Sequence, residues 1–213
     1  KYYEVKNKFR KKSSIFYSPF IDQKEVGILG ILIKKFKNDY KYLLQAKFEP
    51  GNINKIQISP TLQATKSNYT KAHKGKKANF VNLFLNALNK KNYIFKKKLP
   101  EQGTRYLNKY NENIIIKIKN EKFEIPKGFL WVNKDEIKEL LKKNNLINMD
   151  TLSVLSCIVK KDNKRIPLND NIKIINKVSS FIKQHKQEIN PINLKDLKGW
   201  NYQNKQINNI NKK

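Results

Sequence analysis

Polar side chains that could bind or process a ligand follow two neighbouring segments of this 213-residue chain. In the first segment Gln45, Lys47 and Glu49 alternate with apolar residues, and a Pro-Gly-Asn turn at 50–52 leads to the second. There, every other residue is again an amide or a hydroxyl: Gln57, Ser59, Thr61, Gln63 and Thr65. Neutral donors and acceptors suit the specific binding of a polar ligand, whereas a merely solvated face of so lysine-rich a chain would carry mostly lysine. The pattern therefore predicts a binding site.

Such alternation requires strands, because successive side chains of a strand point to opposite faces. Strand signals occur at about 2–9, 14–20, 27–36, 40–49, 56–65, 92–99, 113–119 and 129–132. Helical spacing is found at 80–88, after Asn133, at 151–159 and at 172–186. Asn133 and Glu136 have the spacing of a capping box. Strands and helices mix without strict β-α-β alternation, which predicts an α+β fold with a mixed sheet and flanking helices.

The length of the chain fits one domain with an appendage. We expect a single domain at residues 1–189 and a polar tail or linker at 190–213. The sequence opens in a strand pattern at Lys1 rather than with methionine, so we expect it to be a fragment of a longer protein.

The formal net charge of +29 is supplied almost wholly by lysine, since arginine stands only at positions 10, 105 and 165. Proteins that read nucleic acids depend on arginine for bidentate contacts. Lysine is spread along this chain beside abundant Asn and Ile, which is typical of an AT-rich genome. We therefore attribute the charge to genomic composition and expect no nucleic-acid partner; a nucleic-acid binder is the alternative.

Cys157 is the only cysteine and lies in an apolar run, so we expect an inert thiol and a reducing, cytoplasmic location. No signal peptide is visible and no apolar run has the length of a membrane span, so no membrane partner is expected. His73 follows the polar segments and can shuttle protons or lie exposed in a loop, and His185 is expected on the surface of a polar helix. These three residues make no recognisable metal-ligand set, so we expect no metal.

Short motifs in a fixed order carry a resemblance to a known family. They are Gly27-Ile-Leu-Gly30, Gln45-Ala-Lys-Phe-Glu-Pro-Gly-Asn52, Gln57-Ile-Ser-Pro-Thr-Leu-Gln-Ala-Thr65, Ser67-Asn-Tyr69, Glu101-Gln-Gly-Thr-Arg-Tyr106, and Asn145-Leu-Ile-Asn-Met-Asp150 followed by Ser153-Val-Leu-Ser-Cys157. Over about residues 19–159 the chain resembles the NDP-hexose 2,3-dehydratases of deoxysugar biosynthesis, and Leu197-Lys-Gly-Trp200 is a weaker match.

The resemblance implies a Nudix-like α+β fold, usually as two tandem repeats in a homodimer, of which this chain would be one repeat. The glutamate cluster of Nudix hydrolases is absent, so metal-dependent diphosphate hydrolysis is not expected. The implied substrate is an NDP-4-keto-6-deoxyhexose. A base removes the C3 proton, an acid helps the C2 hydroxyl to leave, and no cofactor is needed because the elimination has no net redox change.

For this chemistry Glu49 is the first candidate for the base. The alternative role of its carboxylate is to order the turn by pairing with Lys47. Lys47 can stabilise the enolate or bind phosphate, or be solvated. Tyr69 can donate the proton to the leaving hydroxyl or be structural. Glu101 is a second candidate for the base.

Sugar hydroxyls and a pyrimidine base call for neutral partners, and the residues expected to bind them are Gln45, Asn52, Gln57, Ser59, Gln63 and Asn68. Their alternative is a hydrogen-bonded ladder that holds the sheet. Arg105 can clamp the diphosphate or form an ion pair with Glu101 or Asp150. Trp131 can stack on the base or belong to the core. A non-catalytic repeat that binds nucleotide sugar or mediates dimerisation is the alternative function.

Overall fold

The fold is taken from a computed structural model, which describes residues 1–9, 11–69, 78–119, 124–157, 168–196, 200–203 and 206–209. The chain divides into two compact units. The first unit comprises Lys1–Gln23, Gln102–Leu107 and Lys160–Lys213, and the second comprises Lys24–Glu101 and Asn108–Val159. Each unit is described separately.

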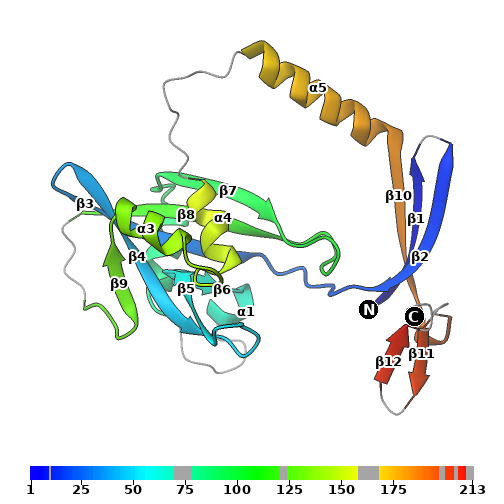
Figure 1. The fold of residues 1–213 in the computed structure, drawn as a ribbon, viewed down its shortest axis with the longest axis horizontal. Coiled ribbons are helices and arrows are strands. Elements are labelled where there is room, and N and C mark those ends of the chain that lie inside the picture. The colour runs from blue at the N-terminus through cyan, green and yellow to red at the C-terminus, as the bar shows by residue number, and fades with distance from the viewer. Residues whose placement is uncertain are drawn as a thin grey trace. The chain divides into compact units, whose positions relative to one another are not determined.

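The second unit is built on a mixed sheet, for which the described residues give seven strands (Figure 1). They are β3 (Gly27–Phe36), β4 (Asp39–Phe48), β5 (Ile56–Pro60), β6 (Leu62–Ala64), β7 (Phe95–Pro100), β8 (Tyr110–Ile118) and β9 (Phe129–Val132). The main path runs β5-β4-β3-β8-β7, while β6 pairs with β3 and β9 with β4. Strands β3 and β8 are parallel, and the other pairs are antiparallel. Four helices accompany this sheet: α1 (Lys66–Tyr69), α2 (Val81–Asn89), α3 (Lys134–Leu141) and α4 (Met149–Ser156).

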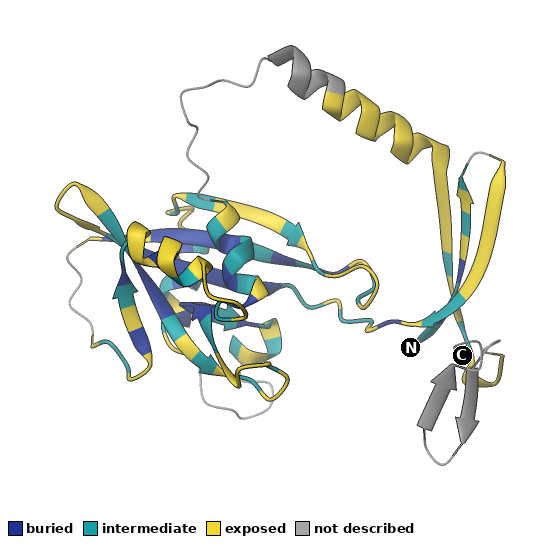
Figure 2. Ribbon diagram, viewed as in Figure 1, coloured by how far each residue is buried: buried dark blue, intermediate teal, exposed yellow. Residues whose placement is uncertain are grey.

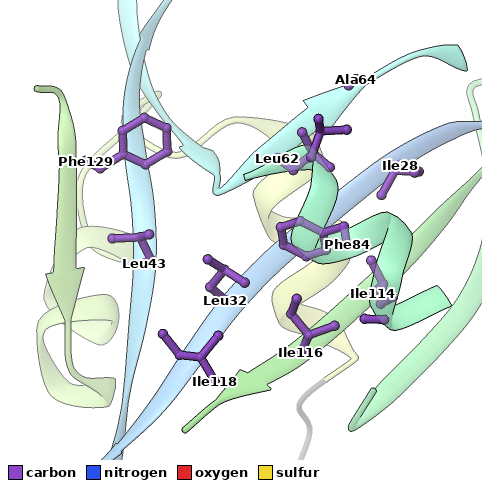
Figure 3. Close-up of a cluster of buried hydrophobic side chains, with 12 residues drawn as sticks. Ile28, Leu32, Leu43, Leu62, Ala64, Phe84, Ile114, Ile116, Ile118 and Phe129 are labelled. Carbon is purple, nitrogen blue, oxygen red and sulfur yellow. The ribbon is translucent and has the colours of Figure 1, made fainter. Parts of the chain in front are cut away.

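Strand β3 lies in the middle of the sheet and contributes to a hydrophobic cluster on each face. Ile28 and Leu32 belong to the first cluster, which is closed by Phe84 of α2 (Figure 3). Gly30 makes this packing possible, because a Cβ atom at that position would lie 2.2 Å from the Phe84 ring. Leu29, Ile31 and Ile33 belong to the second cluster, which is completed by residues of α3 and α4. The burial of both faces explains the near-continuous apolar sequence of β3.

Thr61 stands where the sheet divides. Strand β4 pairs with β3 only as far as Leu43, and from Leu44 onward it pairs with β5. The buried Thr61 hydroxyl accepts a hydrogen bond from Leu32 N at 3.0 Å and donates one to Leu43 O. One side chain thereby replaces the missing ladder bonds of two strands.

The first unit contains a three-stranded antiparallel sheet in the order β10-β1-β2, formed by β10 (His185–Ile192), β1 (Tyr2–Phe9) and β2 (Lys12–Pro19). A hydrophobic cluster of this unit consists of the buried residues Tyr3, Val5 and Phe20, as far as the structure describes the chain. It also contains α5 (Leu168–Gln184), the short helix η1 (Leu194–Asp196) and the pair β11 (Trp200–Gln203) with β12 (Gln206–Asn209). Residues 174–184 of α5 are exposed, as the yellow part of this helix in Figure 2 shows.

The predicted α+β class, with a mixed sheet and flanking helices, is confirmed, and the Nudix-like topology stays a prediction. The capping box of α3 is confirmed, since Asn133 Oδ1 accepts from Glu136 N at 2.9 Å and Glu136 Oε2 accepts from Asn133 N at 2.6 Å. The single strand predicted at 56–65 is wrong, because the bend at Thr61 divides it into β5 and β6. Residue His185 starts β10 and does not lie in a helix. Strand β10 also crosses the boundary expected between residues 189 and 190, and β11 and β12 lie beyond it.

Candidate functional site

The end of β4 carries an ion pair between Lys47 and Glu49. Lys47 Nζ lies 2.8 Å from Glu49 Oε1, and the two side chains are 28% and 32% exposed. Lys47 belongs to β4 and Glu49 directly follows its last residue, and their ion pair holds the two side chains together. Because both are partly withdrawn from water, the attraction is less screened than in a surface pair.

Two amides connect this pair to helix α4. Gln63 Nε2 donates to Glu49 Oε1 at 3.3 Å, and Asn148 Nδ2 lies 3.3 Å from Gln63 Oε1 and 3.0 Å from Ser59 Oγ. Ser59 is only 1% exposed, so its hydroxyl depends on protein partners. The structure thus brings together Lys47, Glu49, Ser59 and Gln63, which the sequence had predicted as site residues.

Asn148 is placed by its role as the N-cap of α4. Its Oδ1 accepts from Thr151 N at 2.8 Å, and Asn148 N donates to Ile58 O at 3.0 Å. The buried Thr151 hydroxyl lies within 3.0 Å of Ile58 O as well. The first turn of α4 is therefore bonded to the edge of β5, next to the ion pair.

Asp150 stands in this first turn and is half-buried. Burial, followed by the negative charges of Glu101 and Glu49, raises the pKa of Asp150 from 3.8 to about 6, while the positive charge of Lys47 acts against the rise. Lys47, Glu49, Glu101 and Asp150, with the amides of Gln63 and Asn148, are named the carboxylate cluster below.

Glu101 follows β7 and is oriented by strand β8. Its Oε1 accepts from Asn111 Nδ2 at 2.5 Å, and Asn111 Oδ1 accepts from Gly27 N at 3.2 Å. A Cβ atom at position 27 would lie 2.8 Å from Asn111 Oδ1, so only glycine leaves room for the Asn111 amide in this position. Asn113, two residues along β8, is 1% exposed; its Oδ1 has no hydrogen-bond partner among the residues that the structure describes.

Three other residues that the sequence predicts to bind substrate lie outside this hydrogen-bonded group. Gln45 is half-buried in β4, opposite Ser59 in the ladder. Gln57 Nε2 donates to Asn145 O at 2.8 Å, and this bond holds the segment before α4 against β5. Asn52 lies in the turn beyond Glu49, where its buried Nδ2 has no partner within the described part of the chain.

Tyr69 and Asn68 belong to the short helix α1. Tyr69 packs against the first hydrophobic cluster, and burial, then the charge of Glu25, raises the pKa of its phenol. Asn68 is exposed. The charges that act on Tyr69 and on Asp150 therefore come from different carboxylates.

Arg105 lies in the first unit, whereas the carboxylate cluster lies in the second. Its backbone is fixed, because Arg105 O accepts from Ile21 N at 2.8 Å, and the residue is exposed. The diphosphate clamp stays a prediction.

The remaining candidates do not join the cluster. Trp131 packs against the first hydrophobic cluster, with Lys34 Nζ at 4.3 Å from its ring centroid. Cys157 is half-buried at the end of α4, and burial raises the pKa of its thiol. His185 is exposed, and His73 lies outside the described residues.

The sequence had offered Asp150 only as a possible partner of Arg105, and it had not singled out Asn111, Asn113 or Asn148. A signal for Asn148 existed, since Asn-x-x-Thr before an apolar run is an N-cap pattern. The alternating Asn111 and Asn113 also precede the apolar part of β8, but amides are uncommon in strands. The strand had therefore been predicted to begin only at residue 113.

No group of three or more His, Cys, Asp or Glu side chains that could hold a metal ion is found within the described ranges. Over the same part of the chain, no helix has both the length and the apolar character needed to cross a membrane.

The arrangement combines a carboxylate beside an ammonium group with a second carboxyl group of raised pKa. Such a pair can supply a base and an acid to one ligand. The surrounding amides can orient neutral oxygens of the ligand.

The model of the NDP-hexose 2,3-dehydratase family matches residues 2–158. Three curated relatives carry the name dTDP-4-dehydro-6-deoxy-alpha-D-glucopyranose 2,3-dehydratase. The relative from Saccharopolyspora spinosa is 40% identical over 152 residues, or 71% of this chain and 31% of the relative. Those from Amycolatopsis orientalis and Streptomyces violaceoruber are 37% and 36% identical; each alignment covers 85% of this chain, and 38% and 43% of the respective relative. The chain thus spans about a third to two fifths of their length.

Proposed function

Because this chain belongs to the NDP-hexose 2,3-dehydratase family, we propose that it eliminates water across C2–C3 of an NDP-4-keto-6-deoxyhexose. The observation that carries the proposal is the family match over residues 2–158, which includes every residue of the carboxylate cluster. The names of the relatives favour a dTDP-linked substrate with the gluco configuration.

In this proposal Glu49 is the base. Its carboxylate takes the C3 proton, which is acidic because C3 lies beside the C4 ketone, and Lys47 stabilises the enolate oxygen that forms at C4. The 2.8 Å ion pair supports these roles, since it keeps a negative and a positive group next to each other before the substrate enters. Gln63 Nε2 donates to the same Oε1 atom of Glu49.

The neutral groups of β4, β5 and β6 are proposed to bind the sugar and the base. Gln45, half-buried in β4, is a candidate for hydrogen bonds to ligand oxygens, whereas Ser59, opposite it in the ladder, holds Asn148. Asn52 adds a buried amide donor beside Glu49, for which the described residues supply no acceptor.

The test is turnover of dTDP-4-keto-6-deoxyglucose by the 213-residue chain, with a reductase that traps the 2-deoxy product. We expect product from the wild type and a loss of about 10²–10⁴-fold in rate for Glu49→Gln. Lys47→Ala should also lower the rate. Glu4→Gln is the control, because Glu4 pairs with Lys6 at 3.0 Å with the same spacing on a strand of the first unit. Normal turnover by both cluster variants would remove Glu49 and Lys47 from the mechanism.

The alternative function is that of a repeat that binds nucleotide sugar, or mediates dimerisation, without catalysis. Calorimetry with thymidine diphosphate separates the two functions, since binding without dehydration by the wild type would favour the second.

The proposal extends to a Nudix-like topology, a homodimer and a cytoplasmic location. The unpaired Cys157 agrees with a reducing compartment. Light scattering of the purified chain tests the dimer, because a monomer mass at every concentration would contradict it.

A further inference from the structure

The carboxylate cluster contains two carboxyl groups with opposite surroundings. Glu49 is held by Lys47 and by the amide of Gln63. The Asp150 carboxyl group, in contrast, makes no hydrogen bond and no ion pair to any residue that the structure describes, although it is half-buried. A carboxyl group left in this state is available to a ligand.

Asn113 supplies an independent sign that a ligand binds here. Its Oδ1 is buried without a partner among the described residues, which is costly unless another molecule donates to it. Asn113 pairs with Leu29, and Leu29 pairs with Gln63, so the three side chains form a row on one face of the sheet. Leu29 packs in one cluster with Val154 of α4, which places the row on the face that α4 covers. The unpartnered Oδ1 of Asn113 therefore belongs to the same face of the sheet as Gln63 of the carboxylate cluster.

We propose that Asp150 is the general acid of the dehydration and protonates the C2 hydroxyl as it leaves. This inference rests on the proposed function and deepens it. The role had been expected of Tyr69, which packs against the first hydrophobic cluster.

The steps balance without any further reactant. The Glu49 carboxylate takes the C3 proton, and the electron pair of the C3–H bond forms the enolate. The enolate collapses to the C4 ketone as a C2=C3 bond forms, the C2–O bond breaks, and the oxygen leaves as water with the Asp150 proton. The resulting 3-enol gives its O–H proton to the Asp150 carboxylate, and C2 receives the proton held by Glu49. Both carboxyl groups thereby return to their starting states.

The surroundings of Asp150 fit an acid. The charged groups that act on it are Glu101 after β7, and Glu49 and Lys47 of β4. Together with burial they raise its pKa to about 6, so a fraction of the molecules carries the proton near neutral pH. Glu101 fits the role less well, because its Oε1 already accepts a 2.5 Å hydrogen bond from Asn111 Nδ2.

The experiment separates the two halves of the reaction. The chain is incubated with dTDP-4-keto-6-deoxyglucose in D₂O, and exchange of the C3 hydrogen is followed by NMR beside formation of the trapped 2-deoxy product. Asp150→Asn should lower product formation by about 10²–10⁴-fold and retain C3 exchange, because the base is intact. Glu49→Gln should lose both. Asp135→Asn is the matched control, since Asp135 is an exposed aspartate in the first turn of α3 and should change neither.

Each outcome of this experiment supports or overturns the role assigned to Asp150. Normal product formation by Asp150→Asn overturns the inference, and so does a loss of C3 exchange equal to that of Glu49→Gln, because an acid for the second step is not needed for the first. Circular dichroism of the variant shows whether it is folded; if Asp150→Asn is unfolded, Asp150→Glu replaces it and must restore part of the product formation. A wild type that neither exchanges C3 nor makes product overturns the proposed function itself, and is recognised because all variants then behave alike.

Discussion

The two units of this chain differ in how their apolar residues are used. In the second unit, isoleucines and leucines of β3 and β8 are buried on both faces of the sheet, and Ile31, Leu32 and Ile114 have no exposed surface. In the first unit, the apolar positions of α5 follow helical spacing yet are exposed: Ile174, Ile175, Val178, Phe181 and Ile182, at 53–65%. Both units contain hydrophobic residues at regular spacing, but those of β3 and β8 in the second unit are buried, whereas those of α5 in the first unit are exposed.

The difference shows that an amphipathic pattern predicts an element without predicting its partner. The second unit encloses a core and also holds the carboxylate cluster, so its rigidity can position the chemistry. Among the residues of the first unit whose burial the structure describes, Tyr3, Val5 and Phe20 form the hydrophobic cluster. We therefore expect the two units to respond differently to the same substitution.

The largest difference is expected for a matched pair of isoleucines. Ile114→Ala in β8 should lower the free energy of unfolding by about 2–5 kcal/mol, because it leaves a cavity in the first hydrophobic cluster. Ile182→Ala in α5, where the side chain is 65% exposed, should change it by less than about 0.5 kcal/mol. Urea unfolding followed by far-UV circular dichroism, which reports on the secondary structure of both units, measures both. A large effect of Ile182→Ala would break the comparison, since it would show that α5 is buried in solution.

The next effect concerns the stability cost of the carboxylate cluster. Because burial and the charges of Glu101 and Glu49 raise the pKa of Asp150 from 3.8 to about 6, the folded protein binds more protons than the unfolded one between these values. Stability then falls as the pH rises through this window, by up to about 3 kcal/mol, and is independent of Asp150 above and below it.

Asp150→Asn should therefore be more stable than the wild type at pH 7.5 and converge with it as the pH falls to about 4. Thermal unfolding at a series of pH values checks this. Asp135→Asn is the control and should show no such gain, since Lys138 holds the pKa of the Asp135 carboxyl group below its ordinary value. Equal stability of Asp150→Asn and wild type at every pH would contradict the cost assigned to the cluster.

The smallest effect is expected at the start of α3. Asn133→Ala removes an N-cap that accepts from Asp135 N and Glu136 N, both at 2.9 Å, and should cost about 1 kcal/mol. Asn133→Asp keeps an acceptor in place and should cost less. Unfolding monitored at Trp131, which lies in the adjacent strand β9, resolves the two; equal losses would show that the cap contributes nothing to the second unit.

Local patterns predicted the elements whose cause is local. The bounds of β3 and the capping box of α3 follow from the side chains of those segments alone. The division of 56–65 into β5 and β6 does not, because it depends on Thr61 reaching the backbones of β3 and β4, which are distant in sequence. The early start of β8 was missed for a similar reason, since Asn111 is held there by Gly27 and Glu101.

The residues of the candidate site likewise divide into those that a local pattern predicts and those that depend on contacts distant in sequence. Lys47 and Glu49 were recognised from their alternation, and Gln63 and Ser59 from theirs. That Asn148 joins Gln63 to Ser59, and that the charge of Glu49 acts on Asp150, depends on the parallel contact between Ile58 and Ile147. No spacing in the sequence encodes that contact, because the two residues belong to segments separated by the whole of α2, β7 and β8.

The pairing of β1 with β10 has a consequence for the synthesis of the chain on the ribosome. Tyr2 pairs with Ile192, so β1 and β2 are made first and wait for their third strand until the second unit has been translated. At about 5–20 residues per second this delay amounts to roughly 10–30 s, while closing a 10-residue loop takes well under a millisecond. During that time the edge of β1 that later receives β10 is an unpaired strand, open to the nascent chains of neighbouring ribosomes. Chaperones that shield such edges would therefore matter more for the first unit than for the second.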